Sequence, residues 1–237
     1  MDREDGCSMI ARQGQLQMLR RARELDCPWD EWTCGIAARY GHLEILVWAR
    51  EHGCPWSEDL EDDCWDCCAL AAEGGHLEVL RWLREHGCPW DLWTCAAAAE
   101  GGHLEVLVWA REHGCPWSED LEDRSLDCCA VAAEGGYLEV LRWLWEHECP
   151  WDESTCATAA LGGHMEVLMW AREHHCPWDG RTSAYAAWGG HLEVLKWARE
   201  NHCPWDAGNA GFTLQHAIEG GHQEVLQWLD EQGVQGA

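Results

Sequence analysis

The chain has 237 residues, and its 43 acidic against 16 basic side chains give a formal net charge of -27. So large an acidic excess repels nucleic-acid phosphates and anionic membrane surfaces, which excludes both as partners and favours a protein with a basic surface. No apolar run is long enough for a signal peptide or a membrane span. We therefore expect a soluble intracellular protein, and the 47% content of hydrophobic residues is sufficient for a substantial core.

The counts of cysteine and tryptophan are unusual. The sequence contains 16 cysteines and 19 tryptophans but a single phenylalanine, Phe212. Small secreted proteins use many cysteines as disulfides, but this chain is long, rich in apolar residues and without a secretion signal. We therefore expect reduced thiols in a reducing compartment.

Internal repeats run through the whole chain. The phrase Cys-Pro-Trp occurs seven times, 27 or 34 residues apart, and each copy is followed by variants of "GHLEVL" and "WAREHG". Residues 7–26 form a degenerate first copy. A period of this length is typical of solenoid proteins. We predict a single repeat domain over 1–237 with eight repeats: 1–26, 27–53, 54–87, 88–114, 115–148, 149–175, 176–202 and 203–237.

Each repeat is predicted to form two short helices. In "TCAAAAEGGHLEVLVWAREHGCPW", residues 94–117, Thr94 is the expected N-cap of an alanine-rich helix that ends at Gly101 and Gly102. A second helix follows, with apolar residues at helical spacing, and Gly114 and Pro116 end it. Helices this short are not stable alone in water, so neighbouring pairs must stack. The predicted fold class is an all-α helical solenoid.

The segment "GHLEVLRWLREHG" at 75–87, preceded by "ALAAEG" at 69–74, resembles an ankyrin repeat. The short repeats, rich in tryptophan and cysteine, are most similar to the ankyrin arrays of giant DNA viruses of amoebae. The resemblance implies a non-catalytic scaffold or adaptor for protein–protein interaction, with no cofactor. The 27-residue repeats are shorter than the family's unit of about 33 residues, and the loss falls between Trp29 and Thr33. We therefore expect the β-hairpin fingers of ankyrin repeats to be shortened or missing.

Packing is the favoured role of the thiols. Aligned with ankyrin repeats, Cys27 takes the place of a buried alanine and Trp29 that of a buried valine. The cysteines fall into two series whose neighbouring members we expect roughly 8 to 10 Å apart, too far for a disulfide or a shared zinc ion. A metal site would have to combine both series, as Cys88, Cys95 and His86 could. A metal-binding or redox protein is therefore kept as one alternative, and a structural or self-assembling virion protein as another.

The tryptophans fall into two classes. Those of the second helix stand where ankyrin repeats bury a leucine, so we expect them in the core: Trp48, Trp82, Trp109, Trp143, Trp170, Trp197 and Trp228. Others differ from repeat to repeat, which packing does not require, and we expect these to be exposed: Trp32, Trp65, Trp93, Trp145 and Trp188.

The candidate partner-binding residues are those that vary between repeats. The position three before each central histidine (or Tyr137) borders the concave groove of ankyrin repeats and holds Arg39, Glu73, Glu100, Glu134, Leu161 and Trp188. Trp32 and Trp93 are added as variable tryptophans. The 34-residue repeats also insert acidic loops with Glu58, Asp59, Glu61 and Asp62 in one and Glu119, Asp120 and Glu122 in the other. These side chains are predicted to bind a basic partner. A plain solvated surface is the alternative.

Catalysis is not predicted. His42 and Glu44 point to different sides of a helix, and most repeats contain the same pair, as a scaffold would. Each Gly-Gly ends a helix, whereas a phosphate-binding loop would open one after a strand. The terminal repeats carry polar residues such as Gln15 and Gln227, which favour a monomer over end-to-end assembly.

Overall fold

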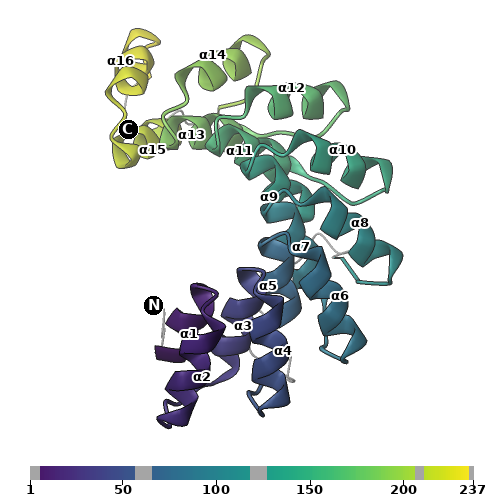
Figure 1. Ribbon diagram of the computed structural model, residues 1–237. Coiled ribbons are helices and arrows are strands. Elements are labelled where there is room, and N and C mark those ends of the chain that lie inside the picture. The colour runs from purple at the N-terminus through teal and green to yellow at the C-terminus, as the bar shows by residue number, and fades with distance from the viewer. Residues whose placement is uncertain (1–5, 57–65, 118–126, 206–210, 235–237) are drawn as a thin grey trace. The chain divides into compact units, whose positions relative to one another are not determined.

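The computed structural model describes residues 6–56, 66–117, 127–205 and 211–234 (Figure 1). These residues form sixteen α-helices and no strand. The chain divides into two compact halves, Met1–Trp117 and Ser118–Ala237. The helices of the first half are α1 (Gly6–Arg12), α2 (Leu16–Glu24), α3 (Glu31–Arg39), α4 (Leu43–Glu51), α5 (Cys67–Glu73), α6 (Leu77–Glu85), α7 (Leu92–Glu100) and α8 (Leu104–Glu112).

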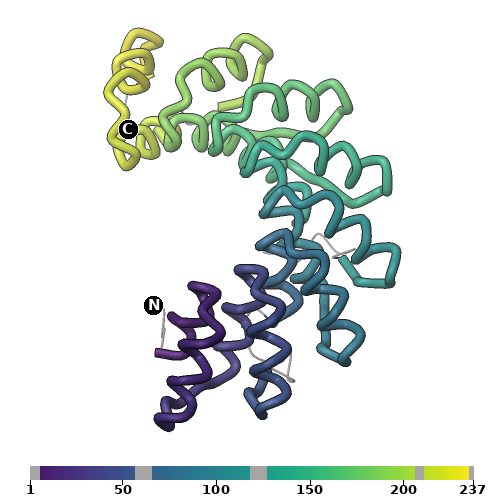
Figure 2. Tube along the Cα trace, in the orientation of Figure 1, coloured from purple at the N-terminus to yellow at the C-terminus, as the bar shows by residue number. Residues whose placement is uncertain are grey.

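The second half contains α9 (Cys128–Glu134), α10 (Leu138–Glu146), α11 (Glu153–Leu161), α12 (Met165–Glu173), α13 (Gly180–Trp188), α14 (Leu192–Glu200), α15 (Gly211–Gly220) and α16 (Gln223–Glu231). Odd-numbered helices are the first helix of each pair, and even-numbered helices are the second. Within each half, every first helix packs against the first helix of the next pair. Figure 2 shows the same succession of helical hairpins. The predicted all-α solenoid is confirmed.

Aspartate side chains begin most of the first helices. The carboxylate of Asp91 accepts the backbone N–H of Trp93 at 2.8 Å, and Asp30, Asp152 and Asp179 cap their helices in the same way. A carboxylate at this end satisfies an unpaired N–H and interacts favourably with the helix dipole. The prediction of Thr94 as N-cap was wrong, because Asp91 stands three residues earlier. Thr94 instead lies buried inside α7, and its hydroxyl has no protein hydrogen-bond partner.

Glycine and histidine join successive pairs. Gly41, at φ +73°, follows α3, and a Cβ there would lie 2.6 Å from the His76 imidazole of the next pair. The same approach recurs between Gly14 and His42, whose Nε2 also lies 3.1 Å from the Arg12 carbonyl oxygen. The positive φ and the close ring both require glycine. The repeated histidines are therefore part of the stacking, as expected of a scaffold element.

The core consists of small residues from the first helices and larger aliphatic residues from the second. Ala97, Ala98, Leu80, Leu83 and Leu107 illustrate the two classes, and all are at most 3% exposed. Because the first helices carry mainly alanine and cysteine on their inner faces, their backbones approach closely. Small residues thus set the spacing of the stack, and leucines fill the space under the second helices.

The thiols are buried, as predicted. Of the fifteen described cysteines only Cys27 is half-buried. The Cys115 thiol donates to the Asp91 carbonyl oxygen at 3.2 Å, and Cys176 makes the same contact with Asp152 at 3.4 Å. Each of these thiols thus adds a hydrogen bond to a carbonyl at the start of the preceding first helix, which also accepts a backbone N–H. Burial raises the pKa of several other cysteines, as for Cys203, where desolvation is the largest cause.

The second-helix tryptophans are not in the core, which contradicts the prediction. All seven are half-buried. Trp82 stacks on His86, with ring centroids 4.1 Å apart, and Trp29 lies edge-to-face with Trp48 at 5.7 Å. An indole is too large for the space that a leucine fills between close-packed helices. It therefore lies at the edge of the stack. Trp29, predicted to replace a buried valine, is also half-buried, whereas its counterpart Trp56 is buried.

Candidate interaction surfaces

The last residues of the first helices form a row along each half, here called the first-helix row. In the first half it consists of Arg12, Arg39, Glu73 and Glu100. A Cβ at Gly74 would lie 2.1 Å from the Arg39 carbonyl oxygen, and one at Gly101 would lie 2.5 Å from that of Glu73. These close approaches place the ends of α3, α5 and α7 side by side.

The charges of the first row are partly neutralised. The Arg39 guanidinium donates to the Glu73 carboxylate in an ion pair between neighbouring helices. Burial raises the pKa of Glu73, while Arg39 lowers it and the nearby Glu100 raises it. The exposed Arg12 ends α1 at the corresponding place, and its guanidinium lies 5.2 Å from the centre of the Tyr40 ring. The row in this half therefore carries both positive and negative charge.

In the second half the first-helix row consists of Glu134, Leu161 and Trp188. A Cβ at Gly189 would lie 2.4 Å from the Leu161 carbonyl oxygen, and one at Gly162 would lie 2.3 Å from that of Glu134. The helix ends are therefore again adjacent. Trp188 is 44% exposed, so this row presents a large indole to solvent.

Aromatic side chains that the sequence analysis did not single out surround Trp188. The ring centroids of Tyr185 and His216 lie 6.1 and 5.8 Å from that of Trp188, and Phe212 lies 4.1 Å from His216. We call these four residues the Trp188 patch. Tyr185 lies one helical turn before Trp188, and that spacing was the available signal. Phe212 and His216 come from the next first helix, α15, and only stacking brings them near.

The other predicted partner-binding residues lie outside the first-helix row. Trp32 is exposed, as expected, and Trp93 is half-buried, which the prediction of exposure did not foresee. Trp93 lies at the start of α7, where only part of its ring reaches solvent. Trp65 and the acidic loop residues lie outside the described residues: Glu58, Asp59, Glu61, Asp62, Glu119, Asp120 and Glu122.

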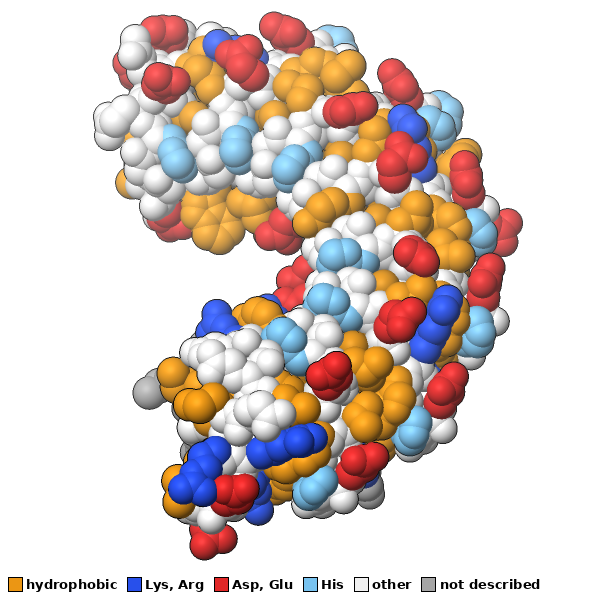
Figure 3. Space-filling view, viewed as in Figure 1, with side chains coloured by type: hydrophobic (Ala, Val, Ile, Leu, Met, Phe, Trp, Pro, Cys, Tyr) orange, Lys and Arg blue, Asp and Glu red, His pale blue; other side chains and the backbone are white. Residues whose placement is uncertain are grey.

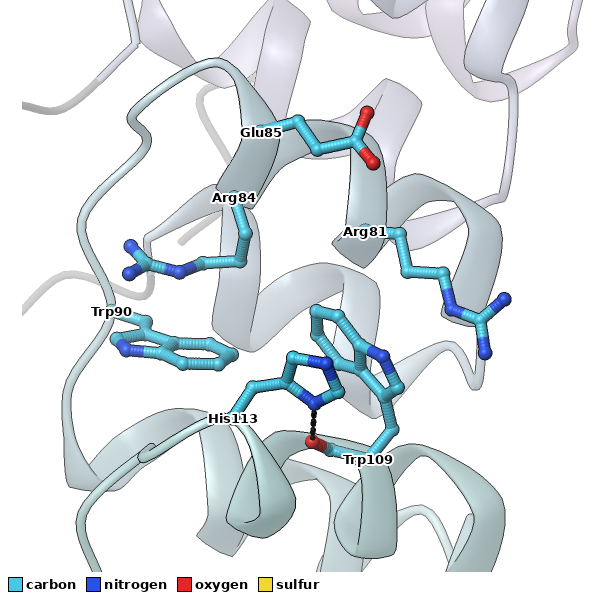
Figure 4. Close-up of a pocket in the computed structure, with 6 residues that line it drawn as sticks. All are labelled: Arg81, Arg84, Glu85, Trp90, Trp109 and His113. Atoms are coloured by element: carbon cyan, nitrogen blue, oxygen red, sulfur yellow. Dashed lines mark hydrogen bonds between the residues drawn. The ribbon is translucent and has the colours of Figure 1, made fainter.

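A second kind of surface lies between neighbouring second helices. A pocket of about 380 Å³ between α6 and α8 is lined by Arg81, Arg84, Glu85, Trp90, Trp109 and His113 (Figure 4). The Arg84 guanidinium lies 4.1 Å from the centre of the Trp90 ring, and that of Arg81 lies 5.8 Å from Trp109. His113 Nδ1 is 2.8 Å from the Trp109 carbonyl oxygen. Cations already cover the aromatic rings of this pocket.

The arrangement of arginine on tryptophan recurs along the chain and was missed in the sequence. Six Cys-Pro-Trp rings have a guanidinium carbon 3.7 to 4.2 Å from their centre. The same arginine donates to the cysteine carbonyl, as Arg50 does to Cys54 at 2.7 Å. Cation–π contact and a charge-assisted hydrogen bond thus hold each turn. The signal was an arginine six residues before each tryptophan.

The thiols considered for a metal site are not brought together with histidine. Cys67 and Cys68 both donate hydrogen bonds to Cys88, which lowers the pKa of that thiol to about 4. His86 stacks on Trp82, and its Nδ1 lies 2.8 Å from the Trp82 carbonyl oxygen. Within the described ranges no three histidine, cysteine, aspartate or glutamate side chains are arranged to hold a metal ion.

Acidic side chains predominate among the charged groups on the surface. Figure 3 shows acidic side chains scattered over the visible face of both halves, with far fewer lysines and arginines. No helix in the described part of the chain combines the length and apolar character needed to cross a membrane.

Comparison with known proteins supports the ankyrin resemblance. The family model of ankyrin repeats (many copies) matches residues 35–84. The ankyrin repeat domain of human ASB11 is similar in structure, with a TM-score of 0.55 and 15% identity, over 73% of this chain and 85% of that domain. No curated protein matches the sequence. The fold is that of an ankyrin-repeat solenoid, and the ankyrin family model supports this assignment over residues 35–84.

Proposed function

We propose that this protein is a non-catalytic scaffold that binds another protein through its first-helix row, with the Trp188 patch as the main anchor. Ankyrin repeats generally mediate protein–protein interaction. The observation that carries the proposal is the 44% exposure of Trp188 among three further aromatic rings. Interaction hot spots are rich in tryptophan and tyrosine in such clusters.

The partner is proposed to have a basic surface. Glu100 and Glu134 are exposed in the first-helix row, and the whole chain carries a net charge of -27. A positive segment would be attracted from a distance and held near the row after contact. The acidic loops, with Glu58, Asp59, Glu61 and Asp62 in one and Glu119, Asp120 and Glu122 in the other, are proposed to add to this attraction.

The setting of this function is proposed to be a reducing intracellular compartment, where the scaffold acts as a monomer. The fifteen described cysteines are all free thiols, which supports such a compartment. The resemblance to arrays of giant DNA viruses extends the proposal to a host protein as partner.

Selection from a displayed peptide library tests the proposal. Peptides enriched on the wild-type protein are expected to be basic with an apolar anchor. Each is then titrated against Trp188→Ala and against Met18→Ala, which removes an exposed apolar side chain outside the predicted binding residues. Loss of an anchor tryptophan costs about 2 kcal/mol or more, or roughly 30-fold in affinity, and we expect this loss only for Trp188→Ala. Equal binding to all three proteins would show that the first-helix row is not the binding surface.

A further inference from the structure

One repeat lacks the arginine that covers the Cys-Pro-Trp ring elsewhere. In the pocket between α6 and α8 this arginine is Arg84, and the residue 61 positions later in the chain is Trp145. The other lining residues have close counterparts at the same offset: Arg142, Glu146, Trp151, Trp170 and His174. A guanidinium is thus replaced by an indole in an otherwise preserved set.

The replacement leaves an aromatic cluster where other repeats have a cation. Trp145 lies 6.4 Å from Trp151, 6.0 Å from Trp170 and 4.8 Å from His174, measured between ring centroids. Trp145 is 41% exposed. Arg142 lies 6.0 Å from the Trp170 ring, at the same place as Arg81 on Trp109, and its Nη1 pairs with Glu139 at 2.9 Å. It therefore does not substitute for the missing cation.

In other repeats this arginine contacts a tryptophan ring and a cysteine carbonyl, and in this repeat the ring and the carbonyl lack that contact. Among the described residues no guanidinium lies over Trp151, in contrast to the other six Cys-Pro-Trp rings. The Cys149 carbonyl receives no side-chain hydrogen bond in the described structure, whereas Arg111 donates to the equivalent Cys115 carbonyl at 2.6 Å. The indole of Trp145 covers apolar surface, but it adds no positive charge.

The local charge of this repeat is also more negative than that of the other repeats. Glu148 occupies the position of Gly53, Gly87 and Gly114 in other repeats, and it adopts their left-handed backbone at φ 59°. Glu148 and the neighbouring Glu146 are both exposed. Relative to a repeat with arginine and glycine, this repeat has lost one positive charge and gained one negative charge. The surface is therefore aromatic and acidic, which suits a cation.

We propose that the Trp145 cluster, consisting of Trp145, Trp151, Trp170 and His174, binds an arginine side chain of a basic partner. The partner's guanidinium stacks on the exposed face of Trp145, with Glu146 and Glu148 at the rim. It supplies from outside the kind of contact that the other repeats make with their own arginine. Guanidinium is favoured because its planar form stacks on indole and is more weakly hydrated than ammonium.

This surface is separate from the first-helix row. Trp145 lies in the last turn of a second helix, whereas Trp188 ends a first helix. Because the second helix of a pair starts where the first ends and runs back beside it, the two sites lie at opposite ends of the helix pairs. Nine-residue helices make this separation roughly 13 Å along the helix axis. The inference therefore does not depend on the Trp188 patch.

The test uses a fluorescein-labelled peptide with arginines spaced by glycines and its citrulline counterpart, which has nearly the same shape without the charge. Binding to the full chain is measured by fluorescence anisotropy at fixed salt. The ring is removed without a change in charge by Trp145→Leu, and Trp145→Arg restores the residue of the other repeats. Met18→Arg is the charge-matched control, because Met18 is 55% exposed and lies in the other half.

We expect Trp145→Leu and Trp145→Arg to weaken binding of the arginine peptide about fivefold or more, and Met18→Arg and Trp188→Ala to leave it nearly unchanged. The citrulline peptide is expected to bind the wild-type protein no more tightly than the arginine peptide binds the Trp145 variants. Thermal unfolding monitored by circular dichroism checks that each variant is folded. Equal binding of the citrulline peptide, or equal loss in Met18→Arg, would overturn the inference. If only Trp188→Ala lost binding, the peptide would belong to the first-helix row, and the proposed function alone would stand.

Discussion

The Cys54 thiol donates a hydrogen bond to the Asp30 carbonyl oxygen at 3.3 Å, across the boundary between two successive helix pairs. Cys54 is fully buried. The cysteine of Cys-Pro-Trp therefore fills a small apolar space and also gives a second hydrogen bond to a carbonyl that already accepts the Thr33 N–H at 3.1 Å. Neither alanine nor valine can do both, which gives a physical reason for so many thiols in this chain.

Burial should protect these thiols from reagents in water. A hydrogen bond with Cys34, burial and nearby charges raise the pKa of Cys54, so the reactive thiolate is scarce even at mildly alkaline pH. Cys88 has a low pKa but is fully buried. Among the described cysteines we therefore expect only the half-buried Cys27 to react quickly with a disulfide reagent in the native protein. Cys27→Ser should remove that fast reaction, and denaturant should expose the others. Fast modification of many thiols without denaturant would contradict the packing role.

The glycine that ends each first helix should be more sensitive to substitution than the glycine that ends the second. Gly41→Ala places a Cβ 2.6 Å from the His76 ring at φ +73°, whereas Gly53→Ala, at φ +82°, meets nothing within 4 Å. The left-handed backbone should lower the free energy of unfolding of both variants by about 1 kcal/mol. The clash should lower that of Gly41→Ala alone by about 1 to 3 kcal/mol more. Urea unfolding of the two variants measures the difference, and equal midpoints would rule out the glycine–histidine contact.

Much of this architecture could be predicted from the sequence, because its signals are local. Gly102 and Gly114 end helices where expected, and alanine and leucine patterns identify the core. Whether a large aromatic ring is buried or exposed could not be predicted from these local signals. Whether Trp82 fits between helices depends on the spacing that small residues on other helices impose. The Trp188 patch likewise needs Phe212 and His216 from another pair, which stacking alone brings close.

Asp91, and not the predicted Thr94, caps α7, and substitution of the two residues should have different effects on stability. Asp91→Ala removes the acceptor for the Trp93 N–H and should cost about 1 kcal/mol. Thr94→Val should be neutral or stabilising by up to about 1 kcal/mol, because the buried Thr94 hydroxyl has no protein partner. Chemical unfolding of both variants compares them directly. A larger loss for Thr94→Val than for Asp91→Ala would restore Thr94 as the cap.

The buried Asp66 should make stability depend on pH near neutrality. Burial raises its pKa from 3.8 to about 7, and the hydrogen bond from the Ala69 N–H, 2.6 Å from Oδ1, only partly opposes this. The folded state then holds the proton more tightly than the unfolded chain, so stability falls as pH rises between about 4 and 7.

Asp66→Asn is the matched variant for this dependence, because asparagine also caps helices but does not titrate. From pH 5 to pH 7 we expect the wild type to lose up to about 2 kcal/mol more than Asp66→Asn, measured as free energy of unfolding in urea. Repulsion among the many other acidic groups changes with pH in both proteins and cancels in the comparison. Parallel pH profiles would mean that Asp66 keeps an ordinary pKa, because water or local opening reaches its carboxylate.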